Sequence, residues 1–203
     1  MKRLELPRTI RTANIDDVPN EPGILGAISD AATANIVEGY TLQTDIADGS
    51  LFQFYAEINV DNSRLWNLTE SLLAILPDKI SFIFGYIDHE LSFSDYDDKE
   101  HILATVSSYS VELSQDGFLE FGFIYHGEDM LTEIFIKKSK YIQFWGTSLK
   151  LFIEVMNEFS LYEVEDLNFI DEYPMVTESL SNLFPEYADT SQVINYFREA
   201  FKK

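Results

Sequence analysis

The feature that most restricts the fold is a succession of three apolar, strand-like runs joined by short turns. The runs cover 118–125, 131–138 and 141–145, and the turn between the first two, 126–129, contains a glycine. Connections this short join antiparallel neighbours, because a parallel crossover needs a dozen or more residues. We therefore predict an antiparallel meander of three strands in the second half of the chain.

The first half of the chain alternates strands with helices. Within 51–60, apolar residues alternate with polar ones, which predicts a strand with one buried face. Asp61 or Asn62 is placed to cap the helix that follows, and Pro77 ends that helix. The run 80–87 is apolar almost throughout, which predicts a central strand that is covered on both faces.

In most of the remaining chain, apolar residues at helical spacing predict helices, and clusters of Pro and polar residues predict turns and irregular segments. Together the elements predict a single α+β domain over 1–203, with a mixed or antiparallel sheet of about five strands and helices packed mainly against one face. We expect an irregular N-terminal arm over 1–22 and short helices and turns over 160–189. Longer helices are expected from Ile24 to near Gly39, over about 98–110, over 149–159 and over 193–201. An Asp97/Glu100 capping box precedes the second of these helices, and Thr147 or Ser148 can cap the third.

Charge is the second strong feature. The chain carries 35 Asp and Glu against 14 Lys and Arg, a formal net charge of -21, yet 14% of its residues are aromatic. That aromatic content indicates a folded protein, because acidic disordered chains contain few aromatics. The acidic residues lie in long blocks: Leu151–Phe197 contains ten carboxylates and no Lys or Arg, and nine carboxylates separate Arg11 from Arg64.

The sequence offers no catalytic residue, no cofactor site and no metal site that matches a known motif. The chain has no cysteine, which excludes disulfides, thiolate nucleophiles and Cys-ligated metals. Gly122 and Gly127 have the spacing of a phosphate loop, but Glu128 and Asp129 follow where Lys and Ser or Thr are needed. The stretch that begins at Ser94 starts like a calcium loop and lacks its glycine.

Two acidic loops are interleaved with aromatic residues, a combination that favours protein binding. Carboxylates steer a cationic partner, and Tyr or Phe supplies buried contact area. A face that only keeps the protein soluble would not need the aromatics. The predicted partner-binding residues are Asp88, Glu90, Asp95, Tyr96, Asp97 and Asp98 in the first loop, and Glu163, Glu165, Asp166, Asp171, Glu172 and Tyr173 in the second.

The resulting hypothesis is a non-enzymatic acidic protein that binds a basic protein partner, most concretely an immunity or inhibitor protein of a bacterial toxin such as a cationic nuclease. The alternative is an enzyme or small-molecule-binding protein whose pocket gathers dispersed residues such as His89, His126 and Glu128. A surface that serves solubility alone is the third interpretation.

Localisation and other partners follow from what the sequence lacks. With neither a signal-peptide pattern nor a long apolar run, we expect a cytoplasmic protein that does not bind membranes. Direct nucleic-acid binding is disfavoured because cations cluster only at 137–140 and at the termini. Imitation of nucleic acid by the acidic surface stays open.

Overall fold

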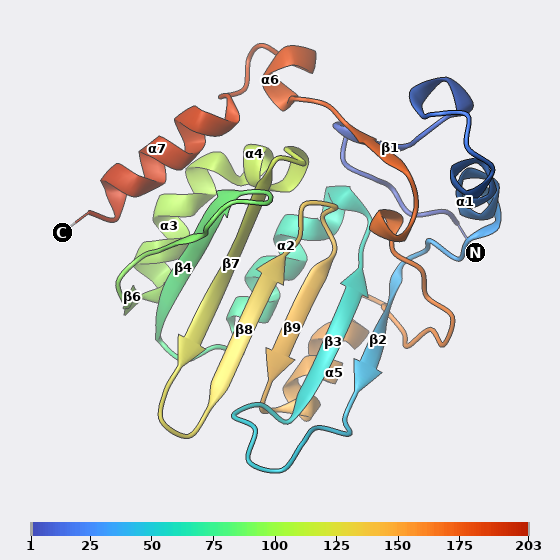
Figure 1. Ribbon diagram of the computed structural model, residues 1–203. Coiled ribbons are helices and arrows are strands. Elements are labelled where there is room, and N and C mark those ends of the chain that lie inside the picture. The colour runs from blue at the N-terminus through green and yellow to red at the C-terminus, as the bar shows by residue number, and fades with distance from the viewer. Residues whose placement is uncertain (1, 203) are drawn as a thin grey trace.

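The computed structural model describes residues 2–202 and builds them around one large antiparallel sheet (Figure 1). The strand order is β2-β3-β9-β8-β7-β4-β5. On the same edge of β4, β5 pairs with its second half and β6 with its first two residues. The predicted meander is confirmed, because β7, β8 and β9 are antiparallel neighbours. The strands are β2 (Gly39–Gln43), β3 (Phe54–Asn59), β4 (Lys79–Tyr86), β5 (Ser92–Phe93), β6 (Asp97–Asp98), β7 (Leu119–His126), β8 (Leu131–Ile136) and β9 (Ile142–Gly146).

The sheet has eight strands, so the prediction of about five was too small. The strands that the sequence did not reveal are β2, β5 and β6. Strands β5 and β6 have two residues each and pair with β4, and β2 begins at Gly39 and pairs with β3. The prediction that 80–87 is a central strand was also wrong, because β4 lies next to the sheet edge. Its residues are nevertheless buried, since helices pack on one side and Leu91 packs over Gly85 on the other.

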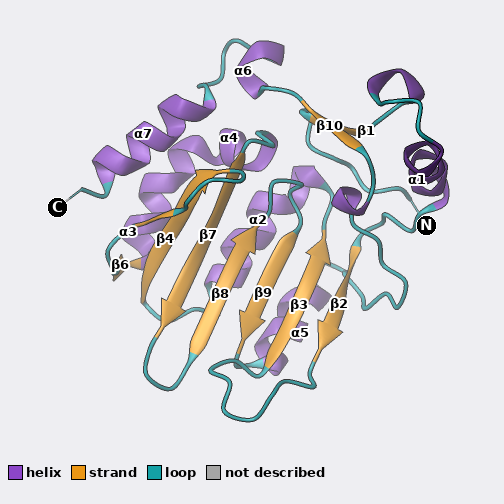
Figure 2. Cartoon of the chain, in the orientation of Figure 1, coloured by secondary structure: helices purple, strands orange, loops and turns teal. Residues whose placement is uncertain are grey.

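The helices pack mainly on one face of the sheet, as predicted (Figure 2). The core lies between this face and α2, α3, α5 and α7, and its ring contacts include Phe82 with Phe197 and Phe144 with Phe152. Helix α3 is continued by a 3-10 turn and α4. The helices are α1 (Pro22–Thr33), α2 (Asn62–Leu73), α3 (Lys99–Val106), α4 (Ser110–Gln115), α5 (Leu149–Glu158), α6 (Leu180–Leu183) and α7 (Thr190–Ala200), with 3-10 turns η1 (Ile15–Asp17), η2 (Ser107–Tyr109) and η3 (Ile170–Glu172).

The N-terminal arm is more ordered than an irregular segment. Its strand β1 (Ile10–Thr12) pairs with β10 (Met175–Thr177) to form a second, two-stranded sheet. Met1 lies outside the described residues. Among residues 2–202, no helix is both long and apolar enough to cross a membrane.

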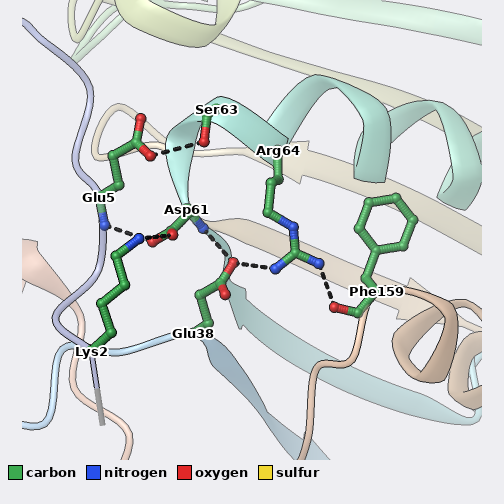
Figure 3. A network of polar contacts seen from close by, with 7 residues as sticks. All are labelled: Lys2, Glu5, Glu38, Asp61, Ser63, Arg64 and Phe159. Carbon is green, nitrogen blue, oxygen red and sulfur yellow. Dashed lines mark hydrogen bonds and ion pairs between the residues drawn. The ribbon is translucent and has the colours of Figure 1, made fainter.

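A network of polar contacts holds the start of the arm against the main sheet (Figure 3). Asp61, which we expected to cap α2, instead accepts hydrogen bonds from the Lys2 ammonium at 2.6 Å and the Glu5 amide at 2.7 Å. Burial opposes ionisation of Asp61, but these contacts hold its pKa below the usual range. Arg64 extends the network by pairing with Glu38 at 2.7 Å and donating to the Phe159 carbonyl. The arm, β2, α2 and the end of α5 are thereby joined.

Candidate functional site

The face of the sheet opposite the core has no helix across it among residues 2–202 (Figure 2). Because side chains alternate along a strand, every second residue of β2, β3, β9, β8, β7 and β4 points to this side. One end of it is covered by segment 167–172, where Tyr141 contacts Phe169 at 4.5 Å between ring centroids and the Asn59 amide donates to the Asn168 carbonyl at 2.9 Å. We call the remainder the uncovered face.

Strand register aligns two neighbouring rows of side chains in the middle of the uncovered face, because residues directly opposite one another point to the same side. Beyond the rows, the exposed Lys79 at the beginning of β4 points to this side as well. The rows together contain four aromatic residues, two carboxylates and no Lys or Arg. The tryptophan row is Gln43, Tyr55, Trp145, Glu133, Ile124 and Ser81. The phenylalanine row is Thr41, Glu57, Gln143, Phe135, Gly122, Ile83 and Phe93.

Tyr55 and Trp145 form the aromatic centre of this face. Their ring centroids are 4.9 Å apart, and both side chains are partly exposed. The Gln143 amide donates to the Tyr55 hydroxyl at 2.7 Å and to Glu57 at 3.2 Å, which fixes the orientation of these two neighbours. Burial, reinforced by Glu57, raises the pKa of Tyr55, so its hydroxyl stays protonated.

Glu133 lies directly opposite Trp145, in the middle of the tryptophan row. Burial raises the pKa of its carboxyl to about 7. Beside it in the phenylalanine row, the Phe135 ring packs over Gly122, where even a Cβ would come within 2.9 Å of a ring carbon. Lys137 lies 5.7 Å from the Phe135 ring centroid and 3.6 Å from Glu120, at the covered end of the face.

The structure divides the first predicted loop between the two ends of β4. Asp88 and Glu90 follow the end of β4, whereas Asp97 and Asp98 pair with its beginning. The eight residues of β4 span about 23 Å. Tyr96 is 44% exposed and its hydroxyl accepts a hydrogen bond from the His126 amide at 2.9 Å. Asp95 also lies at the beginning of β4, so the predicted residues of this loop form two groups along one sheet edge.

The second predicted loop lies at the opposite edge of the sheet. Glu163 forms a bridge with Tyr40 of β2, and Glu165 and Asp166 follow it. Five strand spacings separate β2 from β4, a distance of about 24 Å. The two loops therefore do not meet, and they border the uncovered face from its two sides (Figure 1).

The end of the second loop is used for internal contacts. Asp171 accepts a hydrogen bond from Ser139 at 3.0 Å, and burial raises its pKa. Glu172 accepts from the Asn168 amide at 3.0 Å and from the Phe169 backbone at 3.1 Å. Tyr173 is only partly exposed and packs against a small apolar cluster. Asp171 thus joins the segment to the turn between β8 and β9, whereas Glu172 and Tyr173 stabilise the segment itself and its contact with the N-terminal arm.

The dispersed residues of the alternative hypothesis are not brought together. His89 lies beyond the end of β4, whereas His126 and Glu128 lie at the opposite end of the β4–β7 pair. An open hollow of about 430 Å³ contains His89, Glu90 and Arg198. Among the described residues, no group of three or more His, Asp or Glu is arranged to hold a metal ion.

Sequence reasoning missed the residues of the uncovered face that now stand out, Tyr55, Trp145 and Glu133. The structure places each of them between two buried residues of its strand, and only for Tyr55, between Phe54 and Ala56, are both of these neighbours apolar side chains that mark an outward position in the sequence. Aromatic residues at outward positions of a half-buried strand indicate contact with something other than the core.

Comparison of the chain with protein-family models, with curated proteins and with solved structures gave no significant match.

Proposed function

We propose that the protein is a non-enzymatic, acidic binding protein whose uncovered face docks on a basic protein surface. The observation that carries the proposal is the content of the two rows, in which aromatic side chains and carboxylates lie together without any Lys or Arg. Partly exposed Trp and Tyr are the side chains that most often anchor protein interfaces. A sheet face that served solubility alone would carry charged residues in their place.

Charge complementarity favours a basic partner over other occupants of this face. At a net charge of -21, a second copy of the chain or a nucleic acid is repelled, whereas a cationic protein is attracted. The acidic loops at both sheet edges add to this attraction, because they border the face on either side. The loops therefore accelerate encounter, and the aromatic rows provide the buried contact.

The most concrete partner is a nuclease-type bacterial toxin, since its nucleic-acid-binding surface is basic. An acidic protein bound there excludes the nucleic acid and acts as an immunity or inhibitor protein in the cytoplasm, where such a toxin would reach its substrate. If a toxin is the partner, production of this protein in the same cell restores growth.

The test combines partner capture with kinetics. Proteins retained by the immobilised chain at low salt are identified, and the purified partner is then mixed with the chain in stopped-flow experiments between 25 and 300 mM NaCl. We expect a basic partner whose association rate constant falls steeply with salt. Partners that are all acidic or neutral, or a rate constant independent of salt, would count against the proposal.

A matched pair of variants locates the binding surface. Trp145→Ala removes an aromatic from the uncovered face, whereas Tyr196→Ala removes an aromatic that is 39% exposed on α7, on the helical side. We expect Trp145→Ala to weaken partner binding at least 30-fold, the effect of losing an interface hot spot, and Tyr196→Ala to leave it unchanged. The reverse result would move the interface to the helices.

A further inference from the structure

Glu133 differs from the other carboxylates of the sheet face because no residue of the chain between 2 and 202 pairs with it. Glu57 accepts a hydrogen bond from Gln143 at 3.2 Å, and Glu120 lies 3.6 Å from Lys137 and accepts from the Lys138 amide at 3.1 Å. Glu133 has no such contact and is shielded from water by its neighbours, which is why burial alone raises its pKa to about 7. A desolvated carboxylate without a partner is unfavourable until a cation reaches it.

The neighbour of Glu133 across β9 is suited to receive that cation. Trp145 is directly opposite, so the two Cβ atoms are about 5 Å apart. On its other side, the Trp145 ring contacts Tyr55, whose hydroxyl is held by Gln143. The ring is therefore supported from β3, and Glu133 lies on the opposite side of it.

A guanidinium group matches both members of this pair. It stacks on a Trp ring more favourably than on other aromatics, and it binds a carboxylate with two parallel hydrogen bonds. An ammonium group gains the charge attraction but neither the stacking nor the second hydrogen bond. Ile124, the neighbour of Glu133 on β7, supplies an apolar wall that keeps water from the ion pair.

We propose that Trp145 and Glu133 form the receptor for one arginine side chain of the basic partner. The inference rests on the proposed function and deepens it: among all contacts of the docking surface, this pair sets the preference for an exposed arginine. Bordering carboxylates such as Glu163 attract the partner from a distance, whereas Glu133 contacts it.

The experiment uses arginine peptides as probes and Trp145 as the reporter. The chain contains two tryptophans, and Trp66→Phe in the full-length protein leaves only the emission of Trp145. This background is titrated at pH 8 and 20 mM NaCl with hexa-arginine, hexa-lysine and the uncharged analogue hexa-citrulline. We expect a saturable change in emission with hexa-arginine, at least tenfold weaker binding of hexa-lysine and none of hexa-citrulline.

Two isosteric variants separate contact from long-range attraction. Each removes one negative charge: Glu133→Gln within the receptor and Glu163→Gln at the sheet edge. We expect Glu133→Gln to weaken hexa-arginine binding at least tenfold and Glu163→Gln less than threefold, with circular dichroism showing that both are folded. The proposal would be overturned if the two variants lost hexa-arginine affinity equally, or if hexa-lysine bound as tightly as hexa-arginine.

The two proposals fail in different ways. If a basic protein partner binds and Glu133→Gln does not weaken it, the arginine receptor is wrong and the proposed function stands. If hexa-arginine binds at Trp145 but no basic protein is ever bound, the receptor stands and the proposed function is wrong.

Discussion

Glu133 and Lys140 are ionisable side chains whose pKa values burial moves close to neutrality, one upward and the other downward. Glu133 lies on the uncovered face, where we propose that a partner supplies the missing cation. Lys140 is 3% exposed in the turn between β8 and β9, where its ammonium donates to the Leu119 carbonyl at 2.6 Å and lies 5.8 Å from the Phe121 ring centroid. Both side chains make stability depend on pH, with opposite signs.

The first prediction concerns Glu133. Its pKa is about 7 in the folded protein, against 4.5 for an exposed carboxyl in the unfolded chain. Between these pH values the folded state binds one proton more than the unfolded state, so stability falls as pH rises from about 4.5 to 7. Glu133→Gln removes this penalty. We expect the variant to be more stable than the parent by about 1–2 kcal/mol at pH 8, and nearly equal to it at pH 4.5. Urea unfolding at the two pH values measures this, and an equal difference at both would contradict it.

The second prediction concerns Lys140, whose pKa burial lowers from 10.5 to about 7 against the attraction of Asp116 and Glu120. The unfolded chain binds the extra proton between these values, so stability rises with pH from about 7 to 10.5. Lys140→Met removes that dependence and leaves the backbone unchanged, because both residues are equally disfavoured at the positive φ of 64°.

We expect the stability of Lys140→Met relative to the parent to be about 2 kcal/mol more favourable at pH 6 than at pH 10. Urea unfolding measures it. The control is Lys138→Met, because Lys138 lies in the same turn and is partly exposed. Its effect on the free energy of unfolding should be the same at both pH values. A pH-independent effect of Lys140→Met would show that its ammonium is not desolvated.

At the scale of elements, the sequence identified those that carry a clear periodicity. The alternation in 51–60 and the apolar runs of β7, β8 and β9 belong to strands that bury one face on helices, so the pattern is strong. Strands β5 and β6 have two residues each and exist because β4 offers them a pairing edge. Such strands have no period of their own to detect.

The candidate site was less predictable than the elements, because it depends on register. Tyr55 is far from Trp145 and Glu133 in sequence, and the three become neighbours through the strand order β3-β9-β8. The sequence predicted that β8 and β9 are antiparallel neighbours, but neither the pairing of β3 with β9 nor the register that places Trp145 opposite both Tyr55 and Glu133. The acidic loops were visible in the sequence, whereas their separation to opposite sheet edges was not.

The third prediction tests how closely β7 and β8 pack. A Cβ at Gly122 would lie 2.5 Å from the Ile134 carbonyl oxygen and 2.9 Å from the Phe135 ring, so backbone and ring must both move. We expect Gly122→Ala to destabilise the protein by about 1–3 kcal/mol in urea unfolding. Gly26→Ala in α1 is the control, since nothing lies within 4 Å of its added Cβ and helices favour Ala. Similar effects of the two substitutions would mean that β7 and β8 can separate at little cost.

At the scale of the whole molecule, unpaired negative charge is the dominant property. Fourteen cations cannot neutralise 35 carboxylates, so 21 remain without a compensating charge even if every cation is paired. These charges repel one another in the compact state more than in the unfolded chain. Folding thus proceeds against a repulsion that the aromatic core offsets and that a basic partner would remove.

The last prediction follows from screening of this repulsion. At 10 mM NaCl the Debye length is about 30 Å, longer than the distance of about 24 Å between the two acidic sheet edges, and at 100 mM it is about 10 Å. We expect the melting temperature to rise by about 3–5 °C between these concentrations, equally with KCl, because screening does not depend on the cation's identity. The same salt weakens association with a basic partner, so stability and binding respond in opposite directions. A melting temperature that fell with salt would show that attractive ion pairs, such as Lys2 with Asp61, outweigh the repulsion.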